Sequence, residues 1–304
     1  MYIRLIGLIT VFLLIAKIVS ASVTSEKLGT VSFSNSGSDK VQKHFIRGVA
    51  ALHSFWYPEA LAEFEETTEA DPTFAMGYWG QAMTYNHPLW EEQDLKSAKA
   101  ALSKITNTLN ITKREQDYIH AARLLYGESN KTIRDESYSK AMKSIYSNYP
   151  NDLEAACFYS LSLLGIAKNA ENKLPLQVEA GAIALEVFQK NSDHPCAAHY
   201  TIHAFDTPDL ARLALPSAKR FADIAPASAH AQHMPAHIFI QLGMWKEATK
   251  SNKKGWSTSV AWVKRKNLSK TNRDYHSLQW SHYTNLQQGL LKDAAAVFAI
   301  QQKD

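Results

Sequence analysis

Cysteine is nearly missing from this sequence, which has only two, Cys157 and Cys196, among its 304 residues. Two cysteines cannot build a disulfide scaffold, and their spacing is not that of a zinc ribbon. Each lies in an apolar stretch with helical spacing. The sequence therefore favours buried free thiols, with a single bridge as the alternative.

An excess of one charge is also missing, because 33 Lys and Arg stand against 29 Asp and Glu, for a net charge of +4. No long basic run is present, which argues against a nucleic-acid partner. The 12 glycines and 10 prolines fall at intervals, and alternating β-branched runs are few, so the pattern predicts an all-α protein. A Gly-rich phosphate loop, a GxSxG elbow, a Cys–His nucleophile pair and an HExxH motif are all absent, which excludes the common local signatures of catalysis.

Long apolar runs are confined to the N-terminus, where Arg4 precedes an apolar stretch over residues 5–16. Lys17 interrupts this run, and Val19 and Ala21 place small residues where signal peptidase prefers them. We expect a signal peptide over residues 1–21, hence secretion without stable membrane insertion; an uncleaved anchor is the alternative. Residues 22–38 are small and polar, which predicts a disordered leader before one helical domain over residues 39–304. In a secreted chain the sequons at Asn110, Asn130 and Asn267 would carry glycans.

A repeating pattern of small, aromatic and proline residues begins after residue 39. Gly48 is followed by Ala60, Phe64 and Pro72, and weaker copies occupy residues 138–165, 208–234, 237–256 and 274–302. This pattern resembles the tetratricopeptide repeat (TPR), in which small residues let two antiparallel helices approach and an aromatic ring fills the groove to the next pair. The resemblance implies a right-handed superhelix of about seven helix pairs, starting near residues 39, 73, 113, 151, 193, 227 and 271. The first helix of each pair would line the concave face.

The whole chain also resembles a group of secreted or periplasmic, histidine-rich TPR proteins. The segments that resemble this group are ALHSFWYPEA, NHPLW, HPCAAHYTIHAFD, HAQHMPAHIF and DYHSLQW. The resemblance implies the fold and draws attention to the histidines, but it implies no reaction. We expect such proteins to continue past the end of this chain, which would make it a shortened member. Without a polar capping helix, the last pair would offer an apolar face for self-association.

Histidines are concentrated in the predicted first helices, where neighbouring helices pack about 10 Å apart. His199 and His203 are four residues apart and share a helix face, and so do His233 and His237. We predict that these four imidazoles converge on one zinc or copper ion. Three further residues rank lower as ligands: His230, His276 and Asp206, the last of which could instead accept a ring N–H. The alternative is a set of ordinary hydrogen-bonded or solvated histidines.

A second set of residues is aromatic and lies in the first two predicted pairs. We expect this set to form inter-repeat core and groove wall, or else a stacking platform for a sugar or peptide. Its members are His53, Trp56, Tyr57, Trp79, His87 and Trp90.

The sequence therefore predicts a secreted TPR-type binding protein whose groove takes a peptide, a protein or a small ligand, with a metal held by the histidines. One alternative is a metal-dependent enzyme, a hydrolase or copper oxidase that uses the same histidines. The other is a structural scaffold without metal.

Overall fold

The computed structural model describes residues 26–106 and 111–303, so the predicted signal peptide and the sequon at Asn110 lie outside the described residues. Within these ranges the chain is all-α apart from one short hairpin, as the sequence predicts. Among the helices of the described part, none is both long and apolar enough to cross a membrane.

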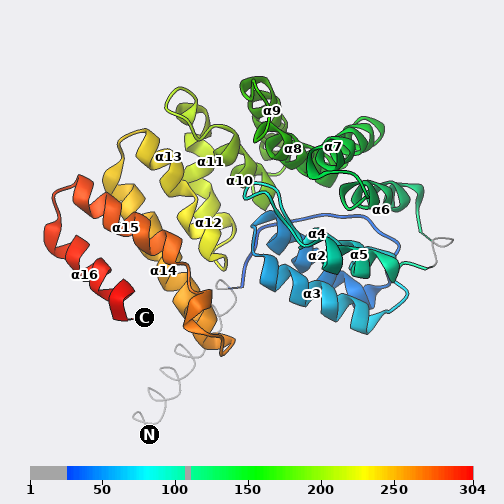
Figure 1. Ribbon diagram of the computed structural model, residues 1–304, viewed down its shortest axis with the longest axis horizontal. Coiled ribbons are helices and arrows are strands. Elements are labelled where there is room, and N and C mark those ends of the chain that lie inside the picture. Colours follow the sequence, from blue (N-terminus) through cyan, green and yellow to red (C-terminus); the bar gives the residue numbers. More distant parts are fainter. Residues whose placement is uncertain (1–25, 107–110, 304) are drawn as a thin grey trace, which may run out of the picture.

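The helices follow one another as seven antiparallel pairs, each packed mainly against its neighbours in sequence (Figure 1). The first four pairs are α2 (Asp39–His53) with α3 (Tyr57–Ala70), α4 (Ala75–Met83) with α5 (Leu95–Ser103), α6 (Lys113–Leu125) with α7 (Lys131–Asn148), and α8 (Leu153–Ala167) with α9 (Leu174–Lys190). The last three are α10 (Pro195–Ala204) with α11 (Ala211–Ile224), α12 (Ala229–His233) and α13 (Pro235–Gln241) with α14 (Trp245–Arg265), and α15 (Tyr275–Gln287) with α16 (Leu291–Lys303). A 3₁₀ turn, η1 (Lys270–Asn272), precedes α15. Each first helix begins within four residues of its predicted start.

Polar caps fix several of these starts, because the first N–H groups of a helix have no partner within it. The Asp152 and Asp274 carboxylates accept from backbone N–H groups at the starts of α8 and α15. Thr112 and Glu115 form a capping box at the start of α6.

Phe64 joins the first two pairs as the sequence predicts. Its ring is fully buried between Gly48 on α2 and Gly80 on α4, and a Cβ at either glycine would collide with it. The two glycines therefore allow the close approach that the aromatic side chain then fills.

The cysteine prediction was wrong: Cys157 on α8 and Cys196 on α10 form a disulfide, and their Cα atoms lie 6.0 Å apart. Both residues are buried on neighbouring first helices. Helical spacing placed each of them correctly in the interior, but it carries no information on which buried side chains meet across two pairs.

The prediction of a disordered leader was also wrong for the residues described, 26–38. Leu28 and Phe33 are buried in the core, and the Thr30 N–H donates to the Asp193 carbonyl at 2.9 Å. The segment has no helix or strand, but these apolar side chains and backbone hydrogen bonds hold it across the helices.

Helix pairs that are distant in sequence also touch, because the array curls back on itself (Figure 1). The end of α2 packs against α10, and the Trp262 Nε1–H of α14 donates to Glu59 of α3 at 3.3 Å. The first pair therefore closes against the fifth and sixth pairs.

Between α4 and α5 lies a hairpin of β1 (Asn86–His87) and β2 (Glu92–Gln93), which the helical periodicity did not predict. It carries Trp90 at its tip, toward the inside of the curled array.

Candidate metal centre

Six histidines lie in two groups of three that could each hold a metal ion. The first trio is His199, His203 and His230, and the second trio is His233, His237 and His276; within each trio, one nitrogen per ring lies within 4.8 Å of the others. This arrangement corrects the predicted four-histidine set. The residues of that set are present, but they divide between two groups, and His230 and His276 are full members.

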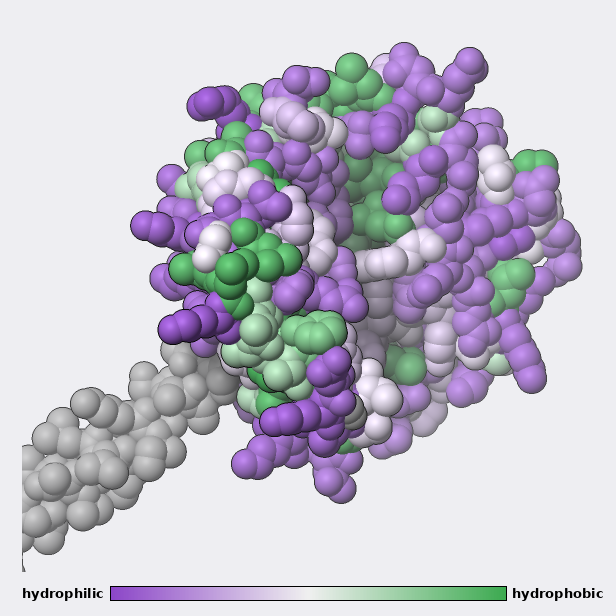
Figure 2. Space-filling view, turned by 60° about the vertical axis from the view of Figure 1, so that its left-hand side comes forward, coloured by the Kyte–Doolittle hydropathy of each residue, from purple (hydrophilic) through white to green (hydrophobic). Residues whose placement is uncertain are grey.

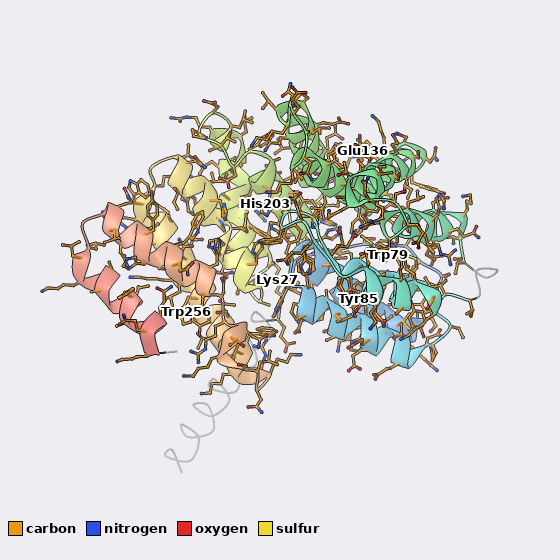
Figure 3. All side chains as sticks on the ribbon, in the orientation of Figure 1. Lys27, Trp79, Tyr85, Glu136, His203 and Trp256 are labelled. Carbon is orange, nitrogen blue, oxygen red and sulfur yellow. A yellow bond between two sulfur atoms is a disulfide. The ribbon has the colours of Figure 1, made fainter. Side chains whose placement is uncertain are left out.

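Local helix geometry explains most of the grouping. His199 and His203 share a face of α10. His203 lies near the middle of the molecule (Figure 3). Pro235 cannot donate a backbone hydrogen bond, so the sixth first helix is divided into α12 and α13 at Met234. His233 and His237 still face each other across this break, with their Nε2 atoms 3.2 Å apart.

In the second trio, two side chains fix which ring nitrogen carries the proton. The His233 Nδ1–H donates to Asn252 Oδ1 at 2.6 Å, and the His237 Nδ1–H donates to Asp206 Oδ2 at 2.7 Å. In its neutral form, a ring that donates through Nδ1 has its lone pair on Nε2. Asp206 is therefore an acceptor for a ring N–H, which was one of its two predicted roles.

In the first trio, a backbone carbonyl at the end of α2 fixes which nitrogen of His199 carries the proton. The His199 Nδ1–H donates to the His53 carbonyl at 2.6 Å, one of the carbonyls at the end of α2 that lack a partner within the helix. The His199 Nε2 lone pair faces the Nε2 atoms of His203 and His230, each at 3.0 Å. One lone pair cannot accept well from both rings.

Burial keeps most of these rings neutral. It lowers the pKa of His199 to about 3, and it lowers the pKa of His203, His230 and His233 well below the ordinary value, with further lowering by neighbouring histidines. The pKa of His276 is lowered for the same first reason. Neutral imidazoles are the form that binds metal ions.

An aromatic side chain covers each trio. Phe55 packs on the first trio, 4.3 Å from the ring of His199 between centroids, and Trp280 packs on the second, 4.4 Å from the ring of His237. Phe55, the residue after the C-cap of α2, has φ = 50°. This left-handed conformation is usually adopted by glycine at that position. Sequence reasoning missed both aromatic residues and Asn252, and the unusual backbone at Phe55 leaves no signal in the sequence.

Both trios open onto one cavity of roughly 850 Å³, whose lining includes Trp56 from the first pair and His276 from the last. Figure 2 shows that the molecular surface is hollowed. Four of the six histidines line it, and His199 and His233 lie buried behind them. The ligand side of each trio therefore faces a space that a small molecule or a peptide side chain can enter.

The predicted groove residues are divided by the structure. Trp56 and Trp90 line the cavity, as expected. Tyr57 and His87 stack on each other outside its lining, with ring centroids 3.9 Å apart. Trp79 is core among the N-terminal helices, away from His203 (Figure 3). His53 is also fully buried and does not line the cavity.

No family model matches this chain, and no curated protein matches it.

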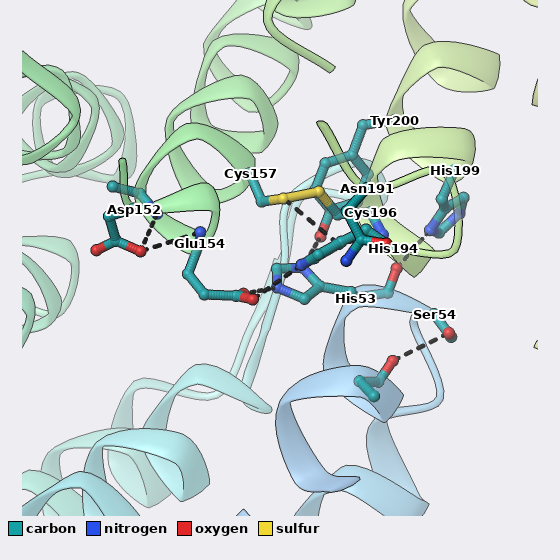
Figure 4. Close-up of polar contacts among 12 residues, drawn as sticks. His53, Ser54, Asp152, Glu154, Cys157, Asn191, His194, Cys196, His199 and Tyr200 are labelled. Atoms are coloured by element: carbon teal, nitrogen blue, oxygen red, sulfur yellow. Dashed lines mark hydrogen bonds and ion pairs between the residues drawn. A yellow bond between two sulfur atoms is a disulfide. The ribbon is translucent and has the colours of Figure 1, made fainter. Parts of the chain in front are cut away.

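Behind the first trio lies a buried carboxylate, Glu154, shown with its partners in Figure 4. It accepts the Nε2–H of His53 at 2.6 Å and the Nε2–H of His194 at 2.8 Å, while His53 Nδ1 accepts from the Tyr200 hydroxyl at 2.8 Å. His53, His194 and Cys157 lie close enough to share an ion, but Cys157 is in the disulfide and has no thiolate to offer. We interpret this network as support for the His53 carbonyl, which orients His199.

Proposed function

We propose that this chain is a secreted TPR-type binding protein, in which a right-handed superhelix forms a concave groove with a transition metal at its floor. The repeat pattern in the sequence and the sequential packing of seven helix pairs support the TPR assignment. The cavity beside the trios suits a small molecule or a side chain of a peptide or protein, so the ligand would bind next to the metal.

The contact between His233 and His237 carries this proposal. Both rings donate through Nδ1, so two Nε2 lone pairs face each other at 3.2 Å. Two acceptors at this distance repel each other, and a cation between them removes the repulsion. Tetrahedral ligands about 2.0–2.1 Å from zinc or copper lie about 3.3 Å apart, close to this spacing. A metal ion between the two rings would accept both lone pairs.

Elemental analysis of the secreted, untagged protein tests the proposal. We expect bound zinc or copper, retained after gel filtration. The double variant His199→Ala, His237→Ala removes one ligand from each trio and should lose the metal. His120→Ala, an exposed histidine outside both trios, should keep it. Only trace metal in the wild-type protein after incubation with zinc and copper would refute the proposal.

A metal-dependent enzyme is the second candidate, favoured by the number of ligands. Catalytic zinc sites keep three protein ligands and one open position, whereas structural sites are closed by four. Each trio supplies three imidazoles beside the cavity. Azide should therefore change the visible spectrum of copper-loaded protein, and an unchanged spectrum would exclude an open position and this candidate.

Secretion, glycosylation and self-association belong to the same proposal. Asn130 and Asn267 are exposed, as glycan acceptors must be, and a mobility shift after glycosidase treatment of the secreted protein would test them. Leu291 and Phe298 on α16 are exposed apolar side chains, which supports self-association through the last pair. Sedimentation of the protein with Leu291→Glu would show whether this face joins two copies.

A further inference from the structure

The two trios are immediate neighbours. The ring centroids of His203 and His237, which belong to different trios, lie 6.3 Å apart, and so do those of His230 and His233. Within the first trio, His203 and His230 are already 6.1 Å apart. The gap between the trios is thus about as wide as the widest spacing inside one of them, so ions held by both would be close enough to share one small ligand.

The short helix α12 supplies one histidine to each trio. His230 and His233 are three residues apart on α12, and the first turns back toward α10 while the second turns forward toward α15. His237, four residues after His233, stays beside it across the break at Pro235. The division into three and three therefore follows from how this segment folds.

All six donor groups are imidazole nitrogens, which bring no negative charge to a metal ion. Asp206, a carboxylate in contact with one of the rings, accepts the His237 N–H at 2.7 Å and the Gln241 amide at 3.0 Å. Without an anionic ligand, a pair of divalent ions would leave four positive charges in a mostly buried site. A pair of Cu(I) ions leaves two, and imidazole is a ligand that suits copper.

We propose, on the basis of the metal site described under Proposed function, that the two trios hold a pair of copper ions that binds dioxygen between them. Each Cu(I) gives one electron to the O₂ molecule, which becomes a peroxide bridging two Cu(II) ions. Release of O₂ returns both electrons, so binding needs no outside reductant and no proton. The cavity lined by His203, His230, His237 and His276 supplies the path for O₂ to the open side of both ions.

The experiment loads full-length protein with Cu(I) under anaerobic conditions and then admits O₂. We expect two copper ions per chain, an intense near-ultraviolet absorption band of bridging peroxide, and no electron paramagnetic resonance signal from the oxygenated protein, because the two Cu(II) spins are coupled. Removal of O₂ under vacuum should abolish the band.

A variant that lacks one ligand of one trio distinguishes a coupled pair of copper ions from a single copper site. His276 is exposed, so His276→Ala should fold, which circular dichroism checks. This variant should bind only one copper ion tightly. After oxidation, the remaining Cu(II) should give an electron paramagnetic resonance signal, and no peroxide band should form. His203→Ala breaks the other trio and should behave alike, whereas His120→Ala should match the wild type.

The outcomes distinguish this inference from the function on which it rests. One copper or zinc ion per chain at saturation would overturn the pair but leave the metal-binding proposal standing, and no metal would overturn both. Two copper ions that give the full signal of uncoupled Cu(II), or that give no peroxide band with O₂, would overturn the pair as an oxygen-binding centre. Two zinc ions with no uptake of copper would overturn the assignment to copper.

Discussion

Replacing Glu154 by glutamine tests the buried network that supports the first trio. The wild-type carboxylate is inaccessible to solvent and accepts two imidazole N–H groups, from His53 and His194. An amide has one acceptor oxygen, and its NH₂ group would face the second ring N–H. Because hydrogen bonds to charged groups contribute about 1.5–3 kcal/mol each, we expect Glu154→Gln to lower the free energy of unfolding by about 2–3 kcal/mol.

The pKa of Glu154 gives a second value for its contribution to the free energy of unfolding. Burial alone would raise the pKa of Glu154, but the two histidines outweigh it and lower the pKa from 4.5 to about 2. This difference corresponds to about 3 kcal/mol. Because the folded pKa lies below the unfolded one, the contribution is fully present above the unfolded pKa, and it is lost as the pH falls toward the folded value. The difference in stability between wild type and variant should therefore shrink over this acidic window.

Urea unfolding of both proteins, stripped of metal and followed by circular dichroism at several pH values, measures both effects. Glu179→Gln is the matched control, since Glu179 is an exposed carboxylate that accepts one hydrogen bond from Tyr159. It should change stability by less than about 0.5 kcal/mol. If Glu154→Gln were as stable as wild type at neutral pH, or lost stability with acid in the same way, the reasoning about this carboxylate would be refuted.

Three further changes test the metal centre, the packing and the cross-link. Asp206→Asn should weaken metal binding to the second trio about 10- to 100-fold in a chelator competition assay, because the carboxylate orients His237. Gly80→Ala should destabilise the protein by about 1–3 kcal/mol in urea, because the added methyl group meets the Phe64 ring. Replacing both Cys157 and Cys196 by serine opens a cross-link over 39 residues and should cost about 4 kcal/mol in the same assay.

Each of these has its own check. Asp209→Asn changes an exposed carboxylate near Asp206 and should leave the metal affinity unchanged; an equal loss in both variants would contradict an orienting role. Adding Phe64→Leu to Gly80→Ala should recover part of the lost stability, since a smaller side chain makes room. If the serine variant kept the stability of the wild type, the bridge would have no stabilising role.

The helix pairs could be predicted because the signals that set their limits are local. Pro72 follows the end of α3, and Asp152 caps the start of α8 within two residues of the predicted start of that pair. The leader escaped prediction for the same reason. The leader is ordered because Leu28 and Phe33 are buried against helices that are distant in sequence. The composition of the leader alone carries no information on those helices.

The candidate site was predictable only within each helix. The four-residue spacings of His199 with His203 and of His233 with His237 gave correct neighbours. The third member of each trio came from a neighbouring first helix: His230 of α12 turned toward α10, and α15 brought in His276. The disulfide between Cys157 and Cys196 could not be predicted for the same reason, because it joins two different helices.

The closure of the first helix pair against the fifth has a consequence for folding. In an open repeat array each unit touches only its neighbours, so units can form or fray one at a time. Here the His53 carbonyl meets His199 across 146 residues of chain, which adds contacts of very high sequence separation. Such contacts slow folding, because a long loop must close before they form. We therefore expect the two ends of the array to lose structure together, so that damage near the N-terminus disorders a centre built more than a hundred residues later.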